Sequence, residues 1–181
     1  MKKLLLACMV ATAMTSCSTL KVGYDYDKQA DFTKYKTYAF SEDALNLPIE
    51  QLNRDRIIKA VETELTAKGF SKSDTPDVLI DLQVKAKQET EATATNTGGM
   101  GMYGGRYGFA GGYGYGGTTH VTYNDYVVGS LFINMVDKAT EKIVWQGRGS
   151  KTLDEDATPA KRDANINAGV KQIFTQYPPK K

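Results

Sequence analysis

A run in the middle of the chain places an apolar residue at every second position from 78 to 86, and this period limits the fold more than any other pattern in the sequence. Its apolar members are Val78, Ile80, Leu82, Val84 and Ala86. Because strand side chains point alternately to opposite faces, this run predicts a strand with one face in a core. A second alternating region spans residues 119–136 and places Leu131, Ile133 and Met135 on one face. Both runs indicate a sheet whose apolar face needs a covering layer.

Two helical patterns supply that layer. Residues 50–68 carry apolar side chains at helical spacing, followed by Gly69 as a helix-ending residue. Thr158 and Pro159 predict the N-cap and first turn of a second helix. The apolar face of the first helix comprises Ile57, Ile58, Val61 and Leu65, and that of the second comprises Ile166, Val170, Ile173, Phe174 and Tyr177.

Shorter alternating segments predict further strands at residues 22–26 and 37–40, and a last strand that starts with Ile143 and Trp145 on one core face. We therefore expect an α+β fold: a two-layer single domain over residues 22–179. Its sheet is expected to be mainly antiparallel, with about five strands and two helices on one face.

Residues 98–117 differ from the rest of the chain. They contain 11 of the 17 glycines, interleaved with aromatic side chains. Ordering so much glycine is entropically costly, and no apolar periodicity offsets that cost. We expect a long β-ribbon with a disordered Gly/Tyr-rich tip, which offers a contact loop for a membrane, a glycan or a protein. The contact residues of this loop are Tyr103, Arg106, Tyr107, Phe109, Tyr113 and Tyr115.

The first residues carry an export signal. Lys2 and Lys3 precede an apolar run from Leu4 to Met14, which is too short to span a bilayer and matches a secretory signal peptide. The run ends in Met14-Thr15-Ser16-Cys17, which resembles a bacterial lipobox. We expect cleavage after residue 16 and lipidation of Cys17, with residues 17–21 as a short tether.

Processing at Cys17 changes the charge and the location of the protein. The formal net charge of +2 falls to about zero, which argues against nucleic-acid binding. Several acyl chains anchor a protein stably in a membrane. Ser18 stands where inner-membrane lipoproteins of this kind carry Asp, and no acidic cluster follows the Cys. We therefore expect an outer-membrane lipoprotein on the periplasmic face.

Candidate catalytic and cofactor patterns lack their required context. Gly99 to Gly104 has the letters of a dinucleotide fingerprint, but more glycine and then a strand follow it instead of a helix. His120 is the single histidine, and neither Ser130 nor Asp125 forms a recognisable triad with it. The acidic run 154–156 lacks the spacing of a calcium loop. We expect no catalytic residue, no cofactor and no metal site, and thus no enzyme.

Several segments together resemble the bacterial lipoprotein family called domain of unknown function 4136. They are 31–40, 64–70, 76–79, 129–131, 136–137, 144–147 and 173–174. The resemblance implies an envelope lipoprotein with a small α+β domain and no established activity. It supplies no catalytic or ligand residues.

Two functions remain open from the sequence. The first is a non-enzymatic binding or structural module, tethered to the outer membrane, whose partner is an unidentified envelope protein or glycan. The second is a glycan-binding or glycan-active protein that uses the exposed tyrosines of the glycine-rich loop. A glycan-cleaving enzyme needs two carboxylates across a cleft, and the sequence distinguishes no such pair.

Overall fold

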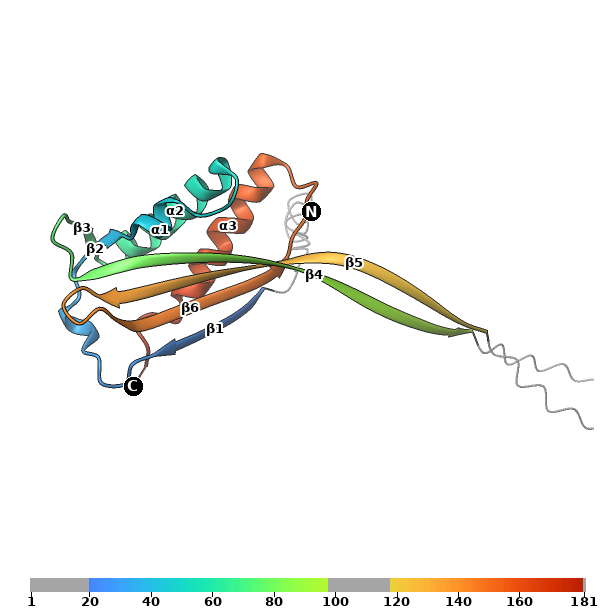
Figure 1. Cartoon of the computed structure of the whole chain (residues 1–181), viewed down its shortest axis with the longest axis horizontal. Coiled ribbons are helices and arrows are strands. Elements are labelled where there is room, and N and C mark those ends of the chain that lie inside the picture. Colours follow the sequence, from blue (N-terminus) through green and yellow to red (C-terminus); the bar gives the residue numbers. More distant parts are fainter. Residues whose placement is uncertain (1–19, 98–117, 181) are drawn as a thin grey trace, which may run out of the picture.

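The computed structural model describes residues 20–97 and 118–180. It shows an α+β fold in which helices cover one face of a mixed sheet (Figure 1). The strands of the sheet are β1 (Lys21–Tyr26), β2 (Thr37–Phe40), β3 (Ser71–Lys72), β4 (Val78–Thr97), β5 (Thr118–Asp137) and β6 (Lys142–Thr152). The helices are α1 (Glu42–Leu45), α2 (Gln51–Ala67) and α3 (Pro159–Phe174), with a 3₁₀ turn at Phe32–Lys34.

Six strands form this sheet within the described residues, in the order β1-β6-β5-β4-β2-β3. The pairs from β1 to β4 are antiparallel, whereas β2 runs parallel to both β4 and β3. The parallel pairs follow from the helices between β2 and β4, which carry the chain back across the sheet. We expected about five mainly antiparallel strands, and the structure has a mixed sheet of six described strands. The additional strand, β3, is two residues long and has no apolar alternation from which it could be predicted.

The core lies between the sheet and the two long helices. The side chains of the predicted apolar faces fill this space. Ile57, Val61 and Leu65 of α2 are buried, as are Ile173 and Phe174 of α3. Trp145 is fully buried, stacks on Phe174 at 5.7 Å between ring centroids, and meets Tyr177 edge-on at 5.4 Å. The prediction that Trp145 packs in the core is confirmed. Gly69 adopts a φ of +85°, as expected for the residue that ends α2.

The start of β6 departs from the predicted alternation. Met135 pairs with Trp145 but Val136 pairs with Ile143, so Val144 is an extra residue in the strand. This bulge buries Val144 beside Trp145 and leaves Ile143 52% exposed. The prediction that Ile143 shares the core face is therefore wrong, because one inserted residue shifts it out of register.

Strands β4 and β5 pair along all 20 residues of each, from Val78 with Asp137 to Thr97 with Thr118. Strand β6 accompanies β5 only from Val128 onward, and β2 accompanies β4 only as far as Ile80. The far half of the pair therefore leaves the body of the protein as a two-stranded ribbon (Figure 1). The expected Gly/Tyr-rich tip at 98–117 lies outside the described residues.

Candidate functional site

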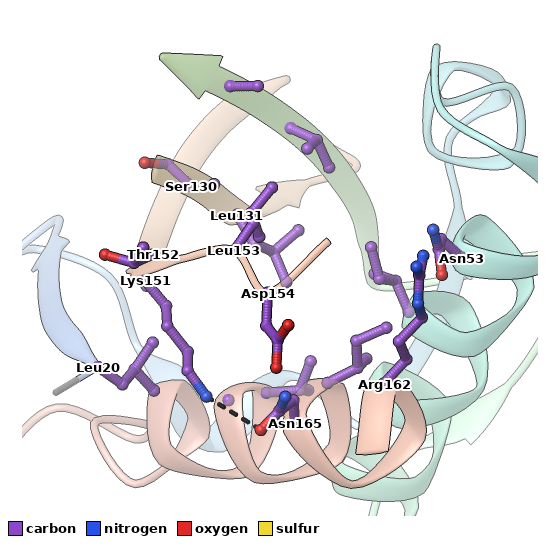
Figure 2. A pocket seen from close by; sticks show the side chains of 18 of the residues that line it. Leu20, Asn53, Ser130, Leu131, Lys151, Thr152, Leu153, Asp154, Arg162 and Asn165 are labelled. Atoms are coloured by element: carbon purple, nitrogen blue, oxygen red, sulfur yellow. Dashed lines mark hydrogen bonds between the residues drawn. The ribbon is translucent and has the colours of Figure 1, made fainter. Parts of the chain in front are cut away.

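A cavity of about 440 Å³ lies between the sheet and the two long helices, at the end of the sheet from which the ribbon leaves (Figure 2). Its floor comes from Val84 of β4, Leu131 of β5 and Gly149 of β6, and its roof from Ile57 of α2 and Ile166 of α3. Val84, Leu131 and Ile166 are only partly buried, although they pack against the core. The apolar layer thus continues from the core into an open cavity.

The floor owes its shape to the side chains of β6 that face the helices. Met135 pairs with Trp145 and Gly129 pairs with Lys151 on this face, and Gly147 and Gly149 lie between the two pairs on β6. A methyl group on Gly149 would stand 2.9 Å from Ile173 Cδ1, so the glycine lets α3 approach the sheet. Along β6, the positions that face the helices are therefore occupied first by the large Trp145 ring, then by two glycines, and then by the charged Lys151.

Two leucines border the cavity on this glycine-lined side. Leu20, directly before β1, packs beside Gly149 and Gly169: methyl groups there would stand 3.5 and 4.0 Å from its Cδ atoms. Leu153 covers Gly129, where a methyl group would stand 2.7 Å from Leu153 Cδ2, yet Leu153 remains 49% exposed. The rim is thus apolar and accessible to solvent.

Polar groups occupy one side of the rim, where Figure 2 shows them around the N-terminal half of α3. Lys151 Nζ donates to Asn165 Oδ1 at 2.9 Å. Arg162 donates to the carbonyl oxygens of Ala157 at 2.9 Å and Glu155 at 2.7 Å, which ties the loop after β6 to α3.

Asp154, on the same rim, accepts from Lys161 Nζ at 2.7 Å. This ion pair lowers the pKa of Asp154, because its carboxylate accepts a hydrogen bond from the lysine. The carboxylate is therefore charged and paired at neutral pH.

This arrangement has the form of a small-molecule binding site. An apolar cavity with a few convergent polar groups is the usual form of a small-molecule site. The described part of the chain holds no group of three or more His, Cys, Asp or Glu side chains that could bind a metal. Among the described rim residues, Arg162 and Asp154 are already engaged in contacts that hold the loop.

A second polar cluster lies at the opposite end of β5 and serves the fold. Asp137 is 3% exposed and accepts from Lys34 Nζ at 2.8 Å and Tyr35 Oη at 2.7 Å. It also accepts from the backbone amides of Ala139 and Thr140. These hydrogen bonds, first those from Lys34 and Tyr35, hold the pKa of Asp137 well below its usual range. Burial and the neighbouring carboxylate raise the pKa of Tyr35 to about 12.

The remaining candidate residues of the sequence do not converge. His120 lies exposed on the ribbon, ten residues along the strand from Ser130, a distance of about 33 Å in extended backbone. Ser130 exchanges a hydrogen bond with Ser150 at 2.8 Å, and Asp125 accepts from Thr90 at 2.7 Å. These three side chains therefore form no triad.

Other predicted residues lie outside the described residues. They are Cys17 and the contact-loop residues Tyr103, Arg106, Tyr107, Phe109, Tyr113 and Tyr115. Among the helices that are described, none is long and apolar enough to cross a membrane.

The sequence model of a family described as "Domain of unknown function (DUF4136)" matches residues 22–179. The chain belongs to this family. The match confirms the resemblance found in the sequence and spans the sheet, the ribbon and all three helices. The description of this family names no activity.

One solved structure has a similar fold within a longer chain. A PDZ domain protein from Parabacteroides distasonis is 22% identical, with a TM-score of 0.53, over 90% of this DUF4136 chain and 37% of that chain. Two PelC dodecamer structures from Paraburkholderia phytofirmans match at 9% and 7% identity and a TM-score of 0.43, over 87% of this chain and 95% and 96% of theirs. No curated protein matches the chain. At 22% identity the likeness to the Parabacteroides distasonis protein concerns the fold alone.

Sequence reasoning missed the cavity, although one signal for it is present. The positions that alternate from Trp145 are Gly147, Gly149 and Lys151. A strand face that changes from tryptophan to two glycines and a lysine cannot fill a core at every position. The pattern becomes informative only when the facing elements are known, because glycine in a strand also marks bulges and close approaches.

Proposed function

We propose that this DUF4136 protein is a lipid-anchored envelope protein that acts as a non-enzymatic binding module, with the cavity between sheet and helices as its ligand site. The observation that carries the proposal is the position of Leu20. This residue borders the cavity and lies three residues after Cys17, the expected lipidation site. Three residues reach at most about 10 Å, so an anchor at Cys17 would hold the cavity close to the bilayer.

The location follows from the residues around the anchor. Ser18 rather than Asp follows Cys17, which supports the outer membrane, and the lack of an acidic cluster supports the periplasmic face. The absence of an enzymatic family description and the structural use of Arg162 and Asp154 support a binding role. The glycan alternative depends on tyrosines outside the described residues, whereas the cavity is built from described ones.

Labelling with a fatty-acid analogue in a bacterial host tests the anchor. Wild type and Cys8→Ser should be labelled, and Cys17→Ser should not. Cys8 is the matched control, because it is the other cysteine of the chain and lies nine residues earlier. Equal labelling of wild type and Cys17→Ser would contradict the lipoprotein proposal.

Binding of a neutral apolar dye tests the ligand site. Ala86 lines the cavity and is exposed, so Ala86→Phe should block the cavity without disturbing the core. Ala92→Phe places the same ring on the same strand, six residues further along the exposed ribbon. We expect saturable dye binding that Ala86→Phe abolishes and Ala92→Phe preserves. Binding that survives Ala86→Phe would refute the cavity as the ligand site.

A further inference from the structure

We propose that the cavity binds a free fatty acid, with the acyl chain among the apolar walls and the carboxylate at Lys151. This inference rests on the proposed function, because it names the ligand class of the same site. It depends on three observations: the direction of the Lys151 side chain, the lack of a carboxylate partner for it, and the shape of the apolar space beside it.

Lys151 points toward the helices, into a layer that is otherwise apolar. It pairs with Gly129, on the same sheet face as the pairs of Leu131 with Gly149 and of Met135 with Trp145. Its side chain is half-buried and reaches α3, where Nζ donates to Asn165. Lysine is rarely placed on a core-facing position unless something pairs with its charge.

The charge of Lys151 is not neutralised by the described part of the protein. None of the ion pairs within residues 20–97 and 118–180 involves it. Two carboxylates line the cavity, and Asp154 is bound to Lys161 at 2.7 Å. Glu155, the other, forms none of these ion pairs with Lys151. An ammonium group has three donors, and Asn165 accepts one of them. Donors therefore remain for the oxygens of an anionic ligand.

The space beside Lys151 is lined largely by apolar side chains from several elements. The cavity lining runs from Leu20 beside β1, across β6, β5 and β4, to Ile49 just before α2. Crossing three neighbouring strands corresponds to about 10 Å at the usual strand spacing. A volume of about 440 Å³ is at the lower end of ligand cavities, which suits one chain better than two. A single linear chain fits this length and lining.

The positive charge of Lys151 also favours one class of lipid ligand over others. The acyl chains expected on Cys17 are joined by uncharged linkages, so they would leave Lys151 without an anion. A phospholipid brings a second acyl chain, for which the cavity has little room. A free fatty acid combines one chain with one carboxylate, which matches a largely apolar cavity beside the Lys151 ammonium group. Arg162, a second cation of the lining, donates to the carbonyl oxygens of Ala157 and Glu155.

Calorimetric titration of the full-length Cys17→Ser chain with laurate and with dodecanol tests this proposal. The two ligands share a chain length and differ in the carboxylate. Lys151→Met should weaken laurate binding at least tenfold and change dodecanol binding less than twofold, whereas Lys151→Arg should retain laurate binding. Lys142→Met is the matched control, because it removes one positive charge from an exposed lysine at the other end of β6, outside the cavity lining.

The cavity variants locate the binding. Ala86→Phe should weaken both ligands and Ala92→Phe neither, and urea unfolding of each variant should show that the fold is kept. Laurate binding that Lys151→Met leaves unchanged, or no laurate binding where the neutral dye still binds, would overturn the fatty-acid inference and leave the proposed function intact. Dye and laurate binding that both survive Ala86→Phe would overturn both.

A last arm separates the protein's own lipid from a free one. Lipidated wild-type protein, purified from membranes and exchanged out of detergent, should bind laurate with the same stoichiometry as Cys17→Ser. If the lipidated protein fails to bind laurate while Cys17→Ser binds it, the chains on Cys17 occupy the cavity and the proposal is wrong.

Discussion

Replacing Gly169 with alanine is expected to stabilise the protein, because this glycine lies inside α3 and has room for a side chain. A methyl group there would have Leu20 Cδ2 as its nearest neighbour, at 4.0 Å, which is ordinary van der Waals contact. Glycine in a helix interior costs about 0.5–1 kcal/mol relative to alanine. Since no steric cost opposes it, the free energy of unfolding should rise by that amount, or the melting temperature by roughly 2–4 °C per kcal/mol.

Gly147→Ala is the matched comparison, and it should act in the opposite direction. A methyl group on Gly147 would stand 2.4 Å from both Ile173 Cγ2 and Trp145 Cη2. Both side chains are buried, so neither can move aside without disturbing the core. We expect a loss of about 1–3 kcal/mol, typical of overpacking. Urea unfolding of both variants measures the difference. Destabilisation by Gly169→Ala, or an unchanged stability for Gly147→Ala, would refute the packing described for α3 on β6.

Three further changes test other parts of the fold. Trp145→Ala should cost about 3–5 kcal/mol in urea unfolding, because it empties a fully buried position, whereas His120→Ala on the exposed ribbon should change stability by less than about 0.5 kcal/mol. Asp137→Asn should lower the free energy of unfolding at pH 7. The difference from wild type should shrink as the pH falls below about 4, because the pKa of Asp137 is lower in the folded than in the unfolded protein. An equal difference at pH 7 and pH 3 would contradict this. Thr158→Ala should cost about 1 kcal/mol, because the Thr158 side chain accepts from the Lys161 amide at the start of α3; a thermal melt unchanged by this substitution would show that the cap does not contribute.

The sequence predicted well those strands and helices whose structure depends mainly on their own residues. The alternation from Val78 to Ala86 lies in β4, and Thr158 caps α3 as expected. These predictions succeed because strand and helix periods are local properties of the side chains. The prediction for Ile143 failed because the bulge at Val144 depends on the partner strand β5.

The candidate site likewise has one part that the sequence predicts and one part that it does not. The expected anchor at Cys17 comes from the sequence alone, because a lipobox is read as a linear motif. The cavity could not be predicted, because its walls come from three strands, two helices, the segment before β1 and the loops before α2 and after β6.

The amino-acid sequence alone was enough to predict the main strands and helices, most of the side chains that face the core, and the family of the chain. The three-dimensional arrangement was needed to show that β2 runs parallel to β4 and that Gly147 and Gly149 lie beneath α3. It was also needed to show that Lys151 and Leu20 line one largely apolar cavity. This difference arises because the spacing of apolar residues and the local composition determine the structure of only a few neighbouring residues. A cavity arises where elements far apart in the chain fail to fill the space between them.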